Sequence, residues 1–150
     1  MREILFRGKR VDNNEWVYGV PSKDNREETV IINNVFECEE YNCRGANCLY
    51  VDENTVGQFT GLTANGKKIF EGDIVVSRYP NGKVCSVGDI QFDCGVFGAE
   101  WTHHKKYRTM VGGFGQLHNL RRLDDDFIEL IEVIGNIHDN PELLEVQNER

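Results

Sequence analysis

Short β-type runs separated by turn residues constrain the fold of this chain more than any other feature. Residues 15–20 alternate polar with apolar side chains, and Asn13-Asn14 in front of them suits a hairpin turn. Asn65-Gly66 is the strongest two-residue hairpin signal in the chain, since such turns need residues that tolerate a positive φ. The pattern predicts a mainly β protein.

The segment after the Asn-Gly turn predicts a buried strand. Gly72 can take the positive φ of a tight turn at little steric cost, and Asp73 can bond neighbouring backbone amides. The β-branched residues 74–76 follow directly. Two further strands are expected at 84–87 and 89–92.

Three stretches are predicted to be loops or links. Residues 39–48 are polar and irregular, residues 94–100 contain glycine, and residues 111–117 are glycine-rich. By contrast, residues 127–134 alternate apolar with acidic side chains, which predicts a strand with one solvent face.

Helix-start signals stand near the end of the chain. Asn140 fits a helix N-cap, Pro141 fits the first helical position, and Glu142 suits the positive end of the helix dipole. A short helix that leads into an acidic tail is therefore expected.

Closely spaced strands with glycine and asparagine turns favour a small, strongly bent barrel of the SH3-like kind. We expect an N-terminal β subdomain over residues 1–50 and an SH3-like barrel over residues 51–138. A basic, glycine-rich loop at 101–122 would be inserted in the barrel, and the short helix and tail would occupy 139–150. A chain of 150 residues buries enough surface to fold without a disulfide or metal.

The formal charge of −8, from 17 basic and 25 acidic residues, is unevenly placed. Residues 124–150 hold nine acids and one base, which accounts for the whole net charge, whereas residues 102–123 hold five bases and no acid. This excludes a globally basic nucleic-acid binder and leaves a local anion site open. It also predicts a contact between the cationic run 105–122 and the acidic strand 124–132, within or between chains.

The cationic run supplies the candidate binding residues. Its aromatic rings can stack on bases, while its Lys and Arg side chains can neutralise phosphates. The candidate residues for nucleic-acid or anion binding are Trp101, His103, His104, Lys105, Lys106, Tyr107, Arg108, Arg121 and Arg122. Nucleic-acid binding is therefore an alternative function, and a solvated surface of mixed charge is the plainer interpretation.

The cysteines and histidines do not form a recognisable metal or catalytic motif. Cys38, Cys43 and Cys48 are evenly spaced, but the usual zinc knuckle of two cysteines separated by two residues is absent from the sequence. We expect reduced thiols, no metal and no cofactor. A metal-dependent hydrolase or nuclease using His118 or His138 is a second alternative. Without an intact catalytic motif we assign no catalytic residue and expect a protein that is not an enzyme.

Hydropathy indicates a cytoplasmic location. No stretch approaches the roughly 18 apolar residues of a transmembrane helix. Residues 1–7 lack the apolar region of a signal peptide. Secreted and membrane proteins are excluded on these grounds, and the net charge of −8 excludes a histone-like protein. No membrane partner is expected.

Motifs spread in order over most of the chain resemble the YopX family. The matching stretches are residues 2–9, 15–19, 55–62, 69–75 and 133–144. The resemblance implies a phage- or prophage-derived accessory protein of Gram-positive hosts that associates with itself. It carries over no activity and no catalytic residue. We therefore expect a non-enzymatic, β-rich binding or assembly module that forms homo-oligomers, with a host or phage protein as a further partner.

Overall fold

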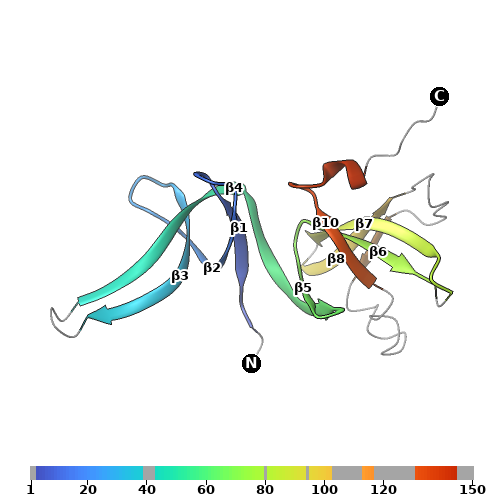
Figure 1. Ribbon diagram of the computed structural model, residues 1–150, viewed down its shortest axis with the longest axis horizontal. Helices are drawn as coiled ribbons and strands as arrows, with labels where there is room; N and C mark the ends of the chain where they lie inside the picture. The colour runs from blue at the N-terminus through green and yellow to red at the C-terminus, as the bar shows by residue number, and fades with distance from the viewer. Residues whose placement is uncertain are drawn as a thin grey trace. The chain divides into compact units, whose positions relative to one another are not determined.

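The computed structural model describes residues 3–38, 43–79, 81–93, 95–102, 113–116 and 131–144. Strands account for most of them (Figure 1). They are β1 (Phe6–Arg10), β2 (Trp16–Lys23), β3 (Thr29–Cys38), β4 (Cys43–Ala64), β5 (Lys67–Phe70), β6 (Asp73–Arg78), β7 (Val84–Asp93), β8 (Val96–Thr102), β9 (Gly113–Gln116) and β10 (Ile131–Asn136). The prediction of a mainly β protein is confirmed.

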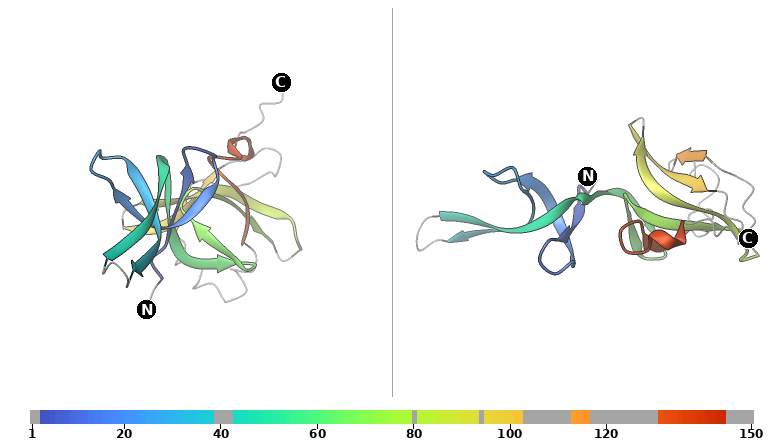
Figure 2. Two further views of the ribbon diagram at one scale, coloured as in Figure 1. Left: turned by 60° about the vertical axis from the view of Figure 1, so that its left-hand side comes forward. Right: turned by 90° about the horizontal axis from the view of Figure 1, so that it is seen from above.

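The chain divides into two compact units, Met1–Gly61 and Leu62–Arg150. One five-stranded sheet has the order β1-β2-β3-β4-β5 with an additional β1–β4 pairing, and the other has the order β10-β6-β7-β8-β9 (Figure 2). The sequence analysis places a subdomain boundary after residue 50. In the structure this position lies inside β4, and the same strand passes from the first unit into the second.

In the first unit, β1 pairs with β2 on one side and with β4 on the other, while β3 joins β2 to β4. The strands approach closely: a Cβ on Gly19 would lie 2.1 Å from the carbonyl oxygen of Ile32. Ile31, Val51 and Phe59 are buried in this unit. The hairpin expected at Asn13-Asn14 is confirmed, and Asn14 takes the positive φ of 59° that such a turn uses.

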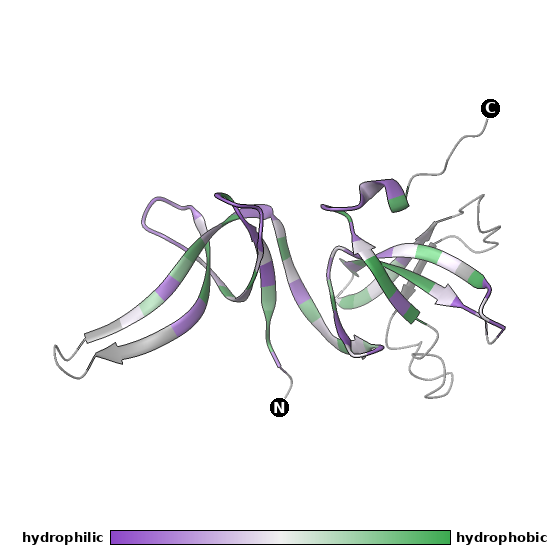
Figure 3. Ribbon diagram, in the orientation of Figure 1, coloured by the Kyte–Doolittle hydropathy of each residue, from purple (hydrophilic) through white to green (hydrophobic). Residues whose placement is uncertain are grey.

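Apolar residues recur along the strands of the second unit (Figure 3). They pack on both faces of its sheet. On one face Val75 packs with Ala64 and Ile69 of the β4–β5 hairpin and with Trp101. On the other face Ile74, Val76 and Val87 are covered by partly buried residues that include Ile137, Leu143 and Leu144. Strand β6 is consequently buried on both sides, which explains its unbroken run of β-branched residues.

Two turn predictions for this unit are confirmed. Asn65 and Gly66 both have positive φ, at 49° and 77°, and they join β4 to β5. Gly72 has φ 82°, and the buried Asp73 carboxylate accepts a hydrogen bond from the Phe70 amide at 2.8 Å. The amide of the turn is thereby satisfied inside the core.

Four loop or strand predictions are wrong within the described residues. Residues 43–48 belong to β4, residues 96–100 belong to β8, and residues 113–116 form β9 rather than loops. The expected strands 84–87 and 89–92 are one strand, β7. In each case backbone pairing with a neighbouring strand decides the conformation, and local composition does not reveal that neighbour.

The short helix expected near the end of the chain is, within the described residues, a single turn. It is a 3₁₀ turn, η3 (Pro141–Leu143), and Asn140 stands at its N-cap position without making a side-chain capping hydrogen bond. The Asn140 amide packs instead against Gly135, whose hypothetical Cβ would lie 2.6 Å from Asn140 Oδ1. In the described part of the chain, no helix has the length and apolarity needed to cross a membrane.

The Asp73 turn yields a stability prediction. Asp73→Ala removes the acceptor for a buried amide and should lower the free energy of unfolding by about 1–3 kcal/mol. Asp73→Asn keeps an acceptor oxygen at the same place and should retain most of that stability. Denaturant titration of the three proteins at one pH measures the difference. Equal losses for the two variants would contradict this role of the acceptor.

Candidate functional site

The first unit carries an open groove of about 330 Å³ between the β2–β3 turn, the β1–β2 turn and β4. The groove is lined by Val11, Glu27, Glu28, Thr29, Tyr50, Val51 and Glu53. Three of these residues are acidic and three present apolar or aromatic surface. The groove is therefore a candidate binding site.

Asp24 holds the turn that places two of the acidic residues at the groove. The amides of Arg26 and Glu28 donate to Asp24 Oδ1 at 2.8 and 2.9 Å, and the Asp24 amide donates to the Glu28 carbonyl at 3.0 Å. Glu27 takes a left-handed conformation with φ 63°, which the Asp24 turn supports. The result is a compact turn in which the two residues after Arg26, Glu27 and Glu28, line the groove.

Tyr50 links this turn to β4. Its hydroxyl donates to Asp24 Oδ2 at 3.1 Å and accepts from Arg26 Nη2 at 3.1 Å. The Arg26 guanidinium also lies 5.8 Å from the centre of the Tyr50 ring and 2.9 Å from a Glu28 carboxylate oxygen. The backbone register Val30↔Tyr50 between β3 and β4 brings these groups together.

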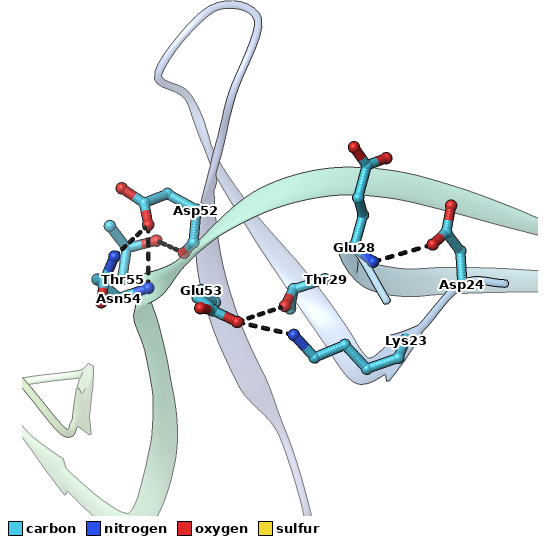
Figure 4. Close-up of polar contacts among 8 residues, drawn as sticks. All are labelled: Lys23, Asp24, Glu28, Thr29, Asp52, Glu53, Asn54 and Thr55. Atoms are coloured by element: carbon cyan, nitrogen blue, oxygen red, sulfur yellow. Dashed lines mark hydrogen bonds and ion pairs between the residues drawn. The ribbon is translucent and has the colours of Figure 1, made fainter. Parts of the chain in front are cut away.

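Glu53 occupies a bend of β4 and points at the β2–β3 hairpin (Figure 4). Its Oε2 accepts from Lys23 Nζ at 2.7 Å and from Thr29 Oγ1 at 3.4 Å. The bend is stabilised by Asp52, whose Oδ1 accepts from the Asn54 amide at 3.0 Å. The hydrogen bond from Lys23 and the charge of its ammonium hold the pKa of Glu53 below its ordinary value.

The pKa of Asp24 is also lowered. Desolvation alone would raise it, but the amides of Glu28 and Arg26 and the Tyr50 hydroxyl favour the charged carboxylate and outweigh desolvation. Asp24 and Glu53 are thus carboxylates whose ionised forms the fold stabilises.

Of the predicted binding residues, the structure describes only Trp101. Trp101 is 9% exposed and packs in the core of the second unit, so its ring serves packing rather than base stacking. The other eight predicted residues, His103 to Arg108 and Arg121-Arg122, lie outside the described residues, and their role stays a prediction.

The predicted contact between the cationic run and the acidic strand is described at one residue only. Glu132 of β10 accepts hydrogen bonds from Arg78 Nε and Nη2 at 3.1 and 3.0 Å. This described partner belongs to the neighbouring strand β6. The bases of the run 105–122 lie outside the described residues. Residues 124–130 lie outside the described residues.

The predicted histidines and cysteines are partly described. The His138 amide donates to Asn136 Oδ1 at 3.0 Å in the turn after β10, and His118 lies outside the described residues. Cys48 is an exposed free thiol, and Cys38 and Cys43 are backbone partners where β3 meets β4. Within the described ranges, no three His, Cys, Asp or Glu side chains are grouped so that they could hold a metal ion.

Sequence reasoning missed the groove entirely. The available signal for the turn beside the groove was the polar, mostly charged run 23–28 between two β-type runs. Asp followed by Asn, as at 24–25, is typical of turns. The partners Tyr50 and Glu53 follow more than twenty positions later, and only the strand register places them beside the turn.

Comparison with known protein families assigns the chain that holds this groove to a family. The family model described as YopX protein matches residues 5–145. The chain belongs to the YopX family. The match covers both units of this YopX-family protein and confirms the resemblance seen in its sequence motifs. No curated protein and no solved structure matches the chain.

The lowered pKa of Asp24 predicts how stability changes in acid. Since the folded pKa lies below the ordinary 3.8, the carboxylate stabilises the fold above that pH and loses this effect as the pH falls through the folded pKa. Asp24→Asn keeps an acceptor for both turn amides but removes the charge. The variant should be less stable than the native protein at neutral pH, and the gap should close in acid.

Urea titrations between pH 7 and pH 2.5 measure this gap. Asp93→Asn, at an exposed carboxylate of the second unit, is the control for the removal of one negative charge. A gap for Asp24→Asn that stays constant across this range would contradict a stabilising charge.

Proposed function

We propose that this YopX-family protein is a non-enzymatic binding or assembly module of phage or prophage origin that forms homo-oligomers in the host cytoplasm. We also propose an SH3-like arrangement for the second unit, which its bent antiparallel strands favour. The single observation that carries the assembly proposal is the outer part of the β3–β4 hairpin.

This hairpin arm consists of residues 34–38 of β3 and 43–47 of β4, which have no further strand beside them in the described pairings. Strand β2 pairs with β3 only from Thr29 to Ile32, and β1 reaches β4 only as far as Val51. From Asn34↔Asn47 to Cys38↔Cys43 the strands of the arm pair only with each other. Figures 1 and 2 show the two strands extending together beyond β1 and β2.

Such an arm offers two backbone edges to a partner. A two-stranded hairpin is marginally stable in water, and unpaired strand edges readily accept another strand. A second copy of the arm supplies an edge of the same kind and length, and closed symmetric pairing is the commonest outcome for identical chains. Self-association through the arm would therefore give it the neighbouring strands that are missing from the described pairings.

The charged groups of the groove favour binding over catalysis. Glu53 pairs with Lys23, and Glu28 pairs with Arg26, so these carboxylates are held by ion pairs with neighbouring side chains. A general acid or base needs a proton affinity near the working pH, whereas the pKa of Glu53 is displaced away from that range.

Removal of the arm tests the assembly proposal. In the test variant, residues 33–47 are replaced by Asn-Gly, so that Ile32 and Cys48, which are already register partners, close a short hairpin. The native chain should sediment at micromolar concentration as a multiple of 17.2 kDa, and the variant should sediment as a monomer.

A matched control replaces only residues 39–42 by Asn-Gly and leaves the paired strands of the arm intact. This control should keep the oligomeric mass. A monomeric native protein, or a variant without the arm that still assembles, would overturn the proposal. Circular dichroism checks that each variant retains its strands.

A further inference from the structure

We propose that the groove of the first unit binds an extended, arginine-bearing segment of a partner protein. The proposal concerns the seven groove residues and not the hairpin arm, so it goes beyond self-assembly. It follows from the shape of the groove, the kinds of surface that line it, and the contacts that two lining residues, Tyr50 and Glu28, make with the guanidinium of Arg26.

The lining of the groove matches the two parts of an arginine side chain. Val11 is 63% exposed and Tyr50 is 41% exposed, although both are large apolar side chains, so apolar surface in the groove is open to contact. Glu27, Glu28 and Glu53 add carboxylates around that surface. An arginine can lay its aliphatic stem on apolar surface and present its planar head to carboxylates.

Arg26 shows this chemistry within the chain itself. Its guanidinium lies 5.8 Å from the Tyr50 ring centre and donates a hydrogen bond to the Tyr50 hydroxyl at 3.1 Å. It also forms an ion pair with the Glu28 carboxylate at 2.9 Å. The Arg26 side chain nevertheless remains 64% exposed. Such an exposed pair is weak, so an incoming guanidinium can compete with Arg26 for Tyr50 and Glu28.

Charge and size define the kind of partner. Asp24, Glu27, Glu28 and Glu53 outnumber the local cations Lys23 and Arg26, and residues 1–61 as a whole hold eleven acidic and seven basic residues. A cationic partner is therefore attracted and an anionic one repelled. About 330 Å³ lies at the lower end of ligand pockets, which suits one or two side chains of an extended segment better than a folded element.

Peptide binding tests the proposal. The probe is a fluorescein-labelled peptide, Gly-Arg-Val-Arg-Gly, titrated with the full-length protein at low salt and followed by fluorescence anisotropy. The triple variant E27Q/E28Q/E53Q keeps the hydrogen-bond acceptors but removes three charges. It should bind about tenfold more weakly, as expected for the loss of about three exposed ion pairs.

The triple variant D93N/E132Q/E142Q is a charge-matched control because it changes the net charge equally at three exposed positions of the second unit. Its affinity should stay within about twofold of the native value, since long-range attraction alone is weak. Arg26→Ala removes the internal competitor and should strengthen binding about threefold. The control Lys83→Ala removes one exposed positive charge from the second unit and should not strengthen binding of the peptide.

Three results would overturn the proposal. They are the absence of an anisotropy change at millimolar protein, an equal loss of affinity in the two triple variants, and weaker binding by Arg26→Ala. A peptide with citrulline in place of both arginines should not bind, which separates recognition of the guanidinium from general peptide binding. Because the readout is peptide affinity rather than mass, a failure here leaves the assembly proposal to be judged by sedimentation.

Discussion

Strand β4 is the constraint on which the rest of the structure depends. It runs for 22 residues and pairs with β3 along one edge, with β1 along the other, and with β5 near its end. Between the pairs Arg7↔Gly57 and Lys9↔Asp52 it carries extra residues and bends, and the hydroxyl of Thr55 satisfies the Lys9 amide at 2.8 Å. Because every buried amide needs a partner, this bend is compatible with folding only where such a side chain is available.

The same β3–β4 pairing generates both candidate interaction surfaces of the first unit. Where β3 and β4 also have β1 and β2 as neighbours, the register Val30↔Tyr50 places Tyr50 beside the Asp24 turn and so builds the groove. Farther out, beyond Asn34↔Asn47, the two strands continue without neighbours in the described pairings and form the arm. One hairpin thus carries both the side chains of the groove and the strand edges of the arm.

Much of the second unit could be predicted from local sequence, because its signals act over a few residues. Asn65-Gly66 and Gly72 take the positive φ that their types tolerate, and the β-branched run after Asp73 forms the strand buried on both faces. Predictions failed where pairing overrides composition: the glycine-rich residues 113–116 are held as β9 by β8. Trp101 was predicted to stack on bases because cationic residues follow it in the sequence. Side chains alternate between the two faces of β8, however, and Trp101 lies on the face that packs in the core.

The sequence by itself determined that the chain is mainly β, where its tightest turns lie, and that it resembles the YopX family, since each of these depends on local residue types and their order. Only the tertiary structure decided that Tyr50 and Glu53 line one groove beside the Asp24 turn and that β4 continues from one unit into the other. The physical reason is register: a shift of one residue between two strands moves every side chain to the opposite face, and no local pattern in this chain specifies that alignment.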